Sequence, residues 1–138
     1  MKSSMVETLG VLLACLGLVS TAFAQRGVGD PSGVARQAVK PAIVSLSGRL
    51  VEVKTEPCEL TTGRSLIGTH IILETPEKER LHVHLGPAGA VADIVARLSS
   101  GQQLTVKAFR TEKMKEKHYV AQSLAAGETT MELRDANL

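Results

Sequence analysis

Alternating apolar and polar residues between Thr69 and Leu85 predict a β-hairpin. With the turn centred on Glu77, every inward pair of facing residues is apolar, and one outward pair carries opposite charges. A slip of one residue would break both patterns, so together they favour this register. The predicted pairs are Ile71–Val83 and Leu73–Leu81 inward, and Glu74–Arg80, Ile72–His82 and His70–His84 outward.

A further strand is predicted before the hairpin. Residues 42–53 alternate in the manner of a half-buried strand, and the Ser47-Gly48 pair interrupts the alternation. This interruption predicts a β-bulge, which would let a long strand bend. Residues 54–68 contain Pro57, Cys58 and Gly63 and are expected to form a loop.

One helix and three more strands are predicted after the hairpin. The helix begins after Gly86-Pro87, carries one apolar stripe, and ends at Ser99-Ser100-Gly101. The stripe consists of Val91, Ile94, Val95 and Leu98. The predicted strands are residues 103–109, 118–126 and 129–135, with a charged turn over residues 111–117.

The order of these elements predicts an all-β fold with one inserted helix. Three strands, a helix and two strands correspond to an OB-fold-like, five-stranded Greek-key barrel, with residues 129–135 as a possible extra C-terminal strand. The predicted domain covers residues 42–135, and residues 25–41 are expected to be a flexible linker because they contain three glycines and two prolines. Barrels of this type are binding scaffolds more often than enzymes.

Several segments resemble those of small exported bacterial OB-fold proteins. The segments are GTHIILET, LHVHLGP, GQQLTVKAF and MELRD, and the resemblance covers residues 46–135. In that family a histidine-bearing strand leads to a V-x-L-G-P segment, and the domain closes with L-R-D. Many of its chains continue with Gly-x-Pro-x-Trp, where this sequence has Ala136-Asn137-Leu138. The resemblance implies an OB-type fold and says little about function.

The first 24 residues are typical of a signal peptide. Lys2 precedes an apolar run over residues 9–19, and Ala22-Phe23-Ala24 has the form of a cleavage site. We therefore expect cleavage after Ala24, export to the periplasm or the medium, and no transmembrane span afterwards. The alternatives are an uncleaved anchor and lipidation at Cys15, a residue that follows a loose lipobox.

Composition narrows the classes of function. The 138-residue chain has a net charge of +2, which does not favour bulk attraction to nucleic acid or anionic lipid. Cleavage would leave Cys58 as the one cysteine, so no internal disulfide is expected. No paired carboxylates, nucleophile motif, phosphate-binding loop or H-E-x-x-H motif is present, and we predict that the protein is not an enzyme.

The outward face of the hairpin is the first candidate site. His70 and His84 face each other and His82 lies diagonally within reach, so two or three imidazoles could hold copper or zinc. Met114 and Met131 are further candidate ligands. Against a metal site, no acidic or thiolate third ligand is visible nearby in the sequence, and ordinary half-exposed strand histidines are the alternative.

Cys58 has three open interpretations. It could pair between chains, join a metal site, or be a buried and inert small residue. No sequence neighbour activates the thiol, and nothing in the sequence places it beside a histidine such as His118. Nucleophilic catalysis is therefore not expected.

A basic loop is the second candidate surface. Lys113, Lys115 and Lys117 alternate after Arg110, and Arg64 lies in the other loop that flanks the ligand face of an OB fold. This rim could attract an anion, whereas Phe109 and Tyr119 are too few aromatic residues for stacking nucleic-acid bases. A solubilised turn that discourages edge pairing is the alternative.

The sequence therefore predicts an exported, non-catalytic binding or interaction module with an unknown protein, glycan or other anion as its partner. The first alternative is a periplasmic metal-binding protein that uses the hairpin histidines. A nucleic-acid-binding domain comes last. The chain is expected to be a monomer or a weak dimer, because short edge strands can pair.

Overall fold

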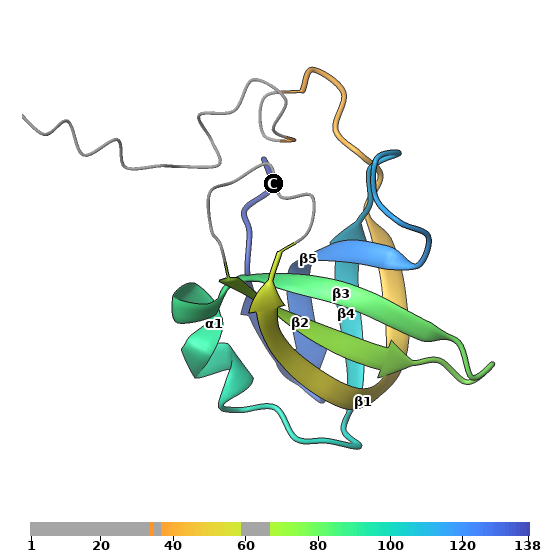
Figure 1. Ribbon diagram of the computed structural model, residues 1–138, viewed down its shortest axis with the longest axis vertical. Helices are drawn as coiled ribbons and strands as arrows, with labels where there is room; N and C mark the ends of the chain where they lie inside the picture. Colours follow the sequence, from red (N-terminus) through yellow and green to blue (C-terminus); the bar gives the residue numbers. More distant parts are fainter. Residues whose placement is uncertain (1–33, 35–36, 59–66) are drawn as a thin grey trace, which may run out of the picture.

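The computed structural model describes residue 34 and residues 37–58 and 67–138. Figure 1 shows these residues as a curved sheet with one short helix at its side. The elements are β1 (Val44–Pro57), β2 (Ile67–Glu74), β3 (Arg80–Pro87), α1 (Ala88–Val95), β4 (Gln103–Phe109), β5 (His118–Ala126) and β6 (Thr129–Glu132). The predicted signal peptide, its cleavage site and Cys15 lie outside the described residues, as does most of the predicted linker.

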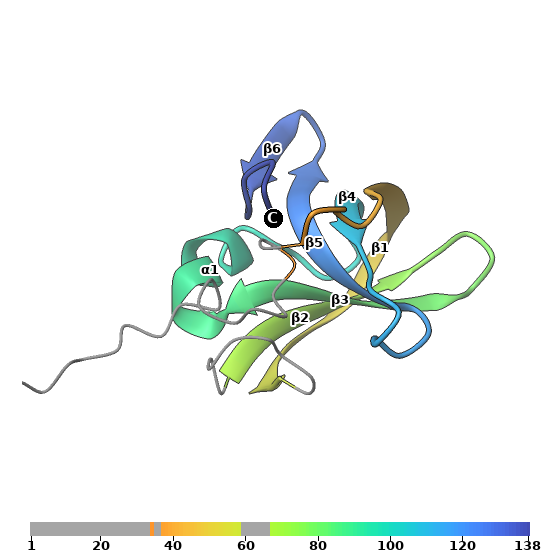
Figure 2. The same ribbon diagram turned by 90° about the horizontal axis from the view of Figure 1, so that it is seen from above.

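Five of the strands close into a ring. The strand order is β3-β2-β1-β4-β5-β6, and a parallel pairing of β3 with β5 joins the two sides. The other pairings are antiparallel, and α1 is inserted between β3 and β4. This arrangement confirms the predicted fold class, with β6 as the extra C-terminal strand that Figure 2 shows outside β5.

The register of the hairpin is the one predicted. His70 faces His84, Ile72 faces His82 and Glu74 faces Arg80, while the inward pairs are also as expected. The Thr75 amide donates to the Glu79 carbonyl at 2.9 Å, which places the turn around Glu77. The inward side chains of this hairpin are almost fully buried, whereas the histidines are only partly buried. The face that carries the histidines is therefore on the outside of the ring.

β1 is longer than predicted, and its bend lies elsewhere. The strand continues to Pro57, so the first part of the expected 54–68 loop is paired with β2. The register shift falls between Leu50 and Glu52, and the expected bulge at Ser47-Gly48 is wrong. Gly48 serves close packing instead, because a Cβ there would lie 2.8 Å from the Glu74 carbonyl oxygen.

The interior of the ring is aliphatic. Residues from every strand and from α1 contribute, and each large side chain buried there contributes about 1.5–3 kcal/mol relative to exposure. The helix ends at Val95, earlier than predicted; Val91, Ile94 and Val95 of the predicted stripe pack against the core from α1, and Leu98 packs there from beyond its end. The largest fully buried side chains are Leu50, Ile71, Leu73, Val83, Leu85, Leu104, Val106 and Leu124.

The chain after β6 is tied back to the ring by Arg134. This residue belongs to the predicted 129–135 strand, and its side chain is partly buried. Its Nη1 donates to the Leu85 carbonyl at 2.8 Å and to the Ala121 carbonyl. The side chain leaves the strand pattern because β6 ends at Glu132.

No helix in the described part of the chain is long and apolar enough to cross a membrane. Of the predicted 25–41 linker, Val34 forms part of a short turn, and its carbonyl accepts hydrogen bonds from the Gln37 amide and Lys40 Nζ.

Candidate metal centre

The outward face of the β2–β3 hairpin brings three imidazoles together. The ring of His70 lies between the other two, with its centroid 4.7 Å from that of His84 and 4.9 Å from that of His82. The facing register of β2 and β3 produces the first contact, and the diagonal relation across the same face produces the second. The predicted histidine cluster is thus present as a geometric group.

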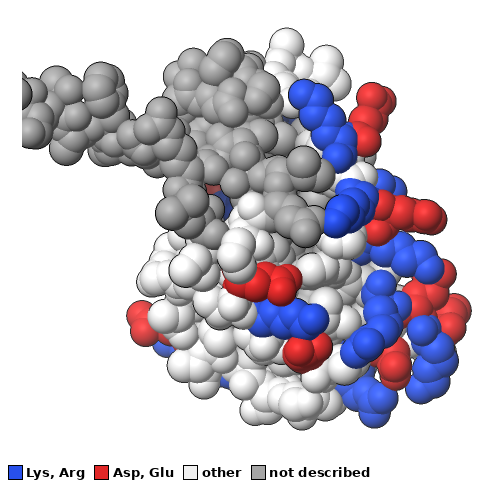
Figure 3. Space-filling view, in the orientation of Figure 1, with Lys and Arg blue, Asp and Glu red and all other residues white. Residues whose placement is uncertain are grey.

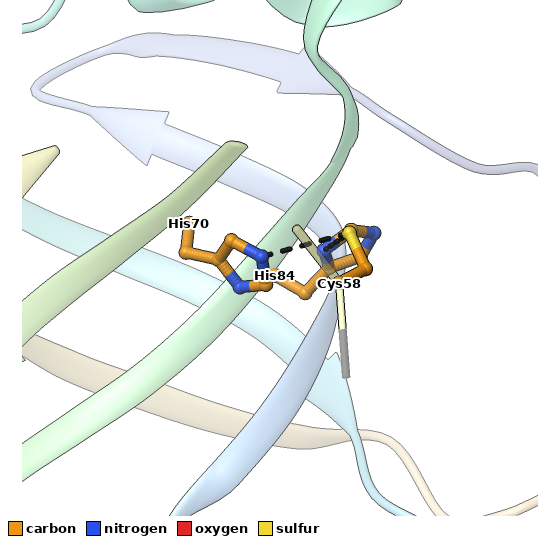
Figure 4. A group of neighbouring side chains, drawn as sticks. All are labelled: Cys58, His70 and His84. Atoms are coloured by element: carbon orange, nitrogen blue, oxygen red, sulfur yellow. Dashed lines mark hydrogen bonds between the residues drawn. The ribbon is translucent and has the colours of Figure 1, made fainter. Parts of the chain in front are cut away.

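Cys58 completes this group. β1 runs beside β2 and delivers the thiol to the histidine face, where Sγ lies 3.7 Å from His70 Nε2 and 3.8 Å from His84 Nδ1 (Figure 4). The sequence showed no thiolate near the histidines and placed no histidine beside Cys58, but the structure brings them together, in line with the interpretation that Cys58 joins a metal site. The reason is the extra length of β1, which carries the chain past His70 up to Pro57.

These separations suit a shared metal ion. Four-coordinate zinc has metal–sulfur bonds of about 2.3 Å and metal–nitrogen bonds of about 2.0–2.1 Å, so its sulfur and nitrogen ligands are about 3.5 Å apart. The observed sulfur–nitrogen distances of 3.7 and 3.8 Å exceed that value only slightly. The ligand atoms of the three residues all lie within 4.8 Å of one another.

Gly68 provides the space for this cluster. A Cβ at this position would lie 2.2 Å from Cys58 Sγ and 2.7 Å from His84 Cε1. Both are far inside van der Waals contact, so any side chain here would displace the thiol or the imidazole. A glycine in a strand often marks a place where another group approaches closely, and here that group is the candidate ligand set.

The protonation states favour metal binding by the imidazoles. Burial lowers the pKa of His84 to about 4, with further contributions from the charges of His70, Arg134 and His82. Burial also lowers the pKa of His70 and of His82. The rings are therefore neutral near pH 7, which is the form that coordinates metal.

The pKa of the Cys58 thiol is shifted in the opposite direction, upward. Burial, and secondarily the negative charge of Glu56, raises the pKa of Cys58. The protonated thiol is therefore favoured in the metal-free protein. A bound cation would reverse this preference, because a coordinating thiol is deprotonated outright.

A second group of possible ligands shares His70. Glu56, His70 and His82 also place ligand atoms within 4.8 Å of one another. Glu56 Oε1 is 3.7 Å from His82 Nε2, and the other nitrogen of that ring, Nδ1, is 3.0 Å from His118 Nε2. All four histidines of the chain thus form one contiguous series.

The two candidate methionines have other contacts. Met131 is part of the aliphatic core on β6. Met114 is in the β4–β5 loop, where its Sδ accepts a hydrogen bond from the Thr111 amide. Neither position supports the idea that methionine joins the histidines.

Two of the basic residues proposed to bind an anion have partners within the chain. Arg110 Nη2 donates to the Met114 and Lys115 carbonyls, so it holds its own loop together. Lys117 Nζ pairs with Glu79 at 3.0 Å, and Lys113 is exposed. Figure 3 shows basic and acidic side chains interleaved on the visible face, at the side where this loop and the hairpin turn meet. Arg64 lies outside the described residues.

The cluster contains residues that were not placed there from the sequence, and for Glu56 and Cys58 the sequence carried a signal. Lys54, Glu56 and Cys58 continue an every-second-residue pattern from Glu52 and therefore share one face of an extended strand. Residues 54–68 were expected to form a loop because they contain Pro57 and Gly63. Gly68 and His118 carried no such signal, because their roles depend on close approach and on the β3–β5 pairing.

The fold and this cluster define a class: a small, closed β-ring protein with a thiol–imidazole group on its outer face. Residues 42–131 match the MamS/MamX magnetosome protein family, and the chain belongs to that family. None of the curated proteins compared with the chain matches it. This family supports the expectation that the chain is bacterial. Export of the protein, and its membership of the exported OB-fold family that the short segments resemble, stay predictions.

Proposed function

We propose that this protein binds a soft transition-metal ion through Cys58 Sγ, His70 Nε2 and His84 Nδ1, and that this is its function as a magnetosome-associated protein. The observation that supports the proposal is the position of one thiol within 3.8 Å of two imidazole nitrogens, over a glycine that leaves room for it. The protein would hold the ion and would not catalyse a reaction.

The donor set favours copper(I), with zinc(II) second. Thiolate ligands select soft ions such as Cu(I), and imidazole suits both copper and zinc. Three protein ligands leave one position of a tetrahedral ion open. An open position on the outside of the ring suits an ion that is passed to another carrier, and a buried four-ligand site would be expected for a purely structural ion.

The alternative of an anion- or protein-docking surface has less support. Two of its proposed cations, Arg110 and Lys117, have partners within the chain. The acidic residues interleaved with the lysines weaken the attraction for any large anion. A partner protein that receives the ion is compatible with the metal-binding proposal, and a nucleic-acid partner gains no support from the structure.

Metal titration of the purified full chain tests the proposal. Cu(I) is added under anaerobic, reducing conditions, and native mass spectrometry reports the number of ions per chain. One ion per chain is expected in the wild type, with a loss of at least tenfold in affinity for Cys58→Ser and for His70→Ala.

Two controls make the result specific. Lys113→Ala changes an exposed residue of the basic loop and should leave copper binding unchanged. Circular dichroism of each variant shows that the β-ring is intact. Wild-type protein that takes up no Cu(I), or a Cys58→Ser variant that binds as tightly as wild type, would refute the thiolate site.

A further inference from the structure

A chain of hydrogen bonds fixes which nitrogen of His82 carries its proton. His118 Nδ1 is 3.0 Å from the Glu116 carbonyl oxygen, and because a carbonyl only accepts, Nδ1 is the donor. In the neutral ring, His118 Nε2 is then an acceptor. His82 Nδ1 lies 3.0 Å from that atom and must donate to it. The remaining nitrogen of neutral His82, Nε2, therefore carries a bare lone pair.

That lone pair has no hydrogen-bond partner among the described residues, although the nitrogen is buried. The nearest charged group is the Glu56 carboxylate, whose Oε1 is 3.7 Å away. A carboxylate oxygen and a bare imidazole nitrogen are both acceptors, so they cannot satisfy each other. Buried polar groups are nearly always paired, and a cation between these two atoms would pair both.

His70 supplies a third ligand to the same place. Its ring nitrogen is within 4.8 Å of the ligand atoms of Glu56 and His82. The same residue is also a member of the Cys58 group. A neutral imidazole has one lone pair, so His70 can coordinate only one ion at a time.

We propose a second, harder metal position formed by Glu56, His70 and His82, which alternates with the Cys58 position because both need His70. The inference rests on the proposed function and adds that the protein distinguishes between two kinds of metal ion. Two imidazoles and a carboxylate suit divalent ions that prefer oxygen and nitrogen, whereas the thiolate position suits Cu(I). The nature of the ion decides which of the two overlapping positions is filled.

His118 is a positioning residue of this second site. It does not join the three ligands, but it holds His82 in the tautomer that presents Nε2 to Glu56. Such outer partners of metal-ligating histidines typically change metal affinity by about 10–100-fold when removed. The parallel pairing of β3 with β5 sets His118 opposite His82, so closure of the ring and preparation of the ligand are linked.

Manganese(II) is the probe for the harder position, because it favours carboxylate over thiolate ligands. Electron paramagnetic resonance of the full-length wild-type chain follows the loss of the free Mn(II) signal. Binding is expected to be unchanged in Cys58→Ser and at least tenfold weaker in Glu56→Gln and in His82→Ala. Glu52→Gln is the matched control on the same strand face and should bind as wild type does.

Competition tests the sharing of His70. One equivalent of Cu(I) is expected to release bound Mn(II) from the wild type, and no release is expected from Cys58→Ser. A complex that holds Cu(I) and Mn(II) together, seen by native mass spectrometry, would overturn the alternation. Absence of Mn(II) binding, or equal binding by Glu56→Gln, would overturn the second position.

The positioning role of His118 is tested by comparing Mn(II) and Cu(I) affinity in one variant. His118→Phe is expected to weaken Mn(II) binding about 10–100-fold and to leave Cu(I) affinity unchanged. Equal losses for both ions would show a general structural effect and contradict the positioning role.

Different results would refute the thiolate site and the harder position. Loss of Mn(II) binding in Cys58→Ser would remove the harder position and leave the thiolate site standing. Mn(II) binding that depends on Glu56, in a protein that takes up no Cu(I), would remove the proposed function and retain the second site.

Discussion

The two ends of the β2–β3 hairpin carry polar residues on the same outward face but satisfy them differently. Near the turn, Glu74 accepts hydrogen bonds from Arg49 at 2.9 Å and from Lys78 at 3.2 Å. At the other end, the imidazoles of His70 and His82 lie beside a carboxylate and a thiol. Donors meet acceptors at the first end, whereas at the second the acceptor nitrogen His82 Nε2 faces the acceptor oxygen of Glu56.

This contrast separates a solubilising surface from a binding surface. Exposed ion pairs like those near the turn need nothing added and contribute little, because solvent screens them. The histidine end is partly buried and contains a nitrogen that no described residue satisfies. An added cation would complete the second end and would do nothing for the first, and the predictions below compare the two.

The largest expected effect is stabilisation by copper(I). An ion that binds only the folded state, at 1,000 times its dissociation constant, adds about 4 kcal/mol to the free energy of unfolding. For a domain of this size each kcal/mol raises the melting temperature by about 4–8 °C. Thermal unfolding with and without a copper(I) chelator measures the difference.

The Cys58→Ser variant tests whether that stabilisation belongs to the histidine end. We expect a smaller copper-dependent rise in its melting temperature than in wild type, because weaker binding stabilises the folded state less, while a Glu74→Gln variant keeps the full shift. A copper-dependent shift of equal size in Cys58→Ser would mean that the ion is bound elsewhere.

Acid should destabilise the metal-free protein through the histidine end. His84 has a pKa of about 4 in the folded protein, and the ordinary value of about 6.5 applies after unfolding. The unfolded chain therefore binds the proton first, so this contribution to stability is complete above pH 6.5 and is lost as the pH falls toward 4. The loss is about 1.4 kcal/mol for each unit of pKa difference, as an upper value.

Urea unfolding at pH 7 and pH 5, with a chelator present, measures this dependence. His84→Gln is the comparison, since it removes the titrating ring and retains a polar side chain. The variant should lose less stability than wild type between the two pH values. Identical losses would show that other groups account for the pH dependence.

Filling the space above Gly68 should disrupt the histidine end alone. Gly68→Ala places a Cβ within 2.2 Å of Cys58 Sγ, and overpacking of this kind costs about 1–3 kcal/mol. We expect copper(I) affinity to fall at least tenfold as the thiol is displaced. Gly89→Ala is the matched control, because no atom outside its chain neighbours and its own helix lies within 4 Å of the added Cβ.

Calorimetric titration of both variants provides the measurement, after circular dichroism has shown that each is folded. Equal copper affinity in Gly68→Ala and wild type would contradict the geometry of the thiolate site.

Much of the fold follows from periodicity in the sequence. The pairing of His70 with His84 was predictable because apolar residues on the opposite face admit one register. Cys58 was not placed, because local turn signals around Pro57 conflicted with a strand that continues through pairing with β2. His118 could not be placed at all, since it reaches His82 only when β3 and β5 close the ring. Long-range pairing, rather than local pattern, assembles the candidate site.

The smallest expected effect lies near the turn. Hydrogen bonds from Lys78 and then Arg49 lower the pKa of Glu74, but both of these partners are exposed to solvent and Glu74 is only partly buried. Glu74→Gln should therefore leave the urea midpoint unchanged at physiological salt, because screened surface pairs offset their attraction with desolvation and lost side-chain freedom. A clear loss of stability in this variant would mean that the pairs near the turn help to set the hairpin register. The histidine end would then depend on the turn for its alignment, and copper affinity should fall in Glu74→Gln as well.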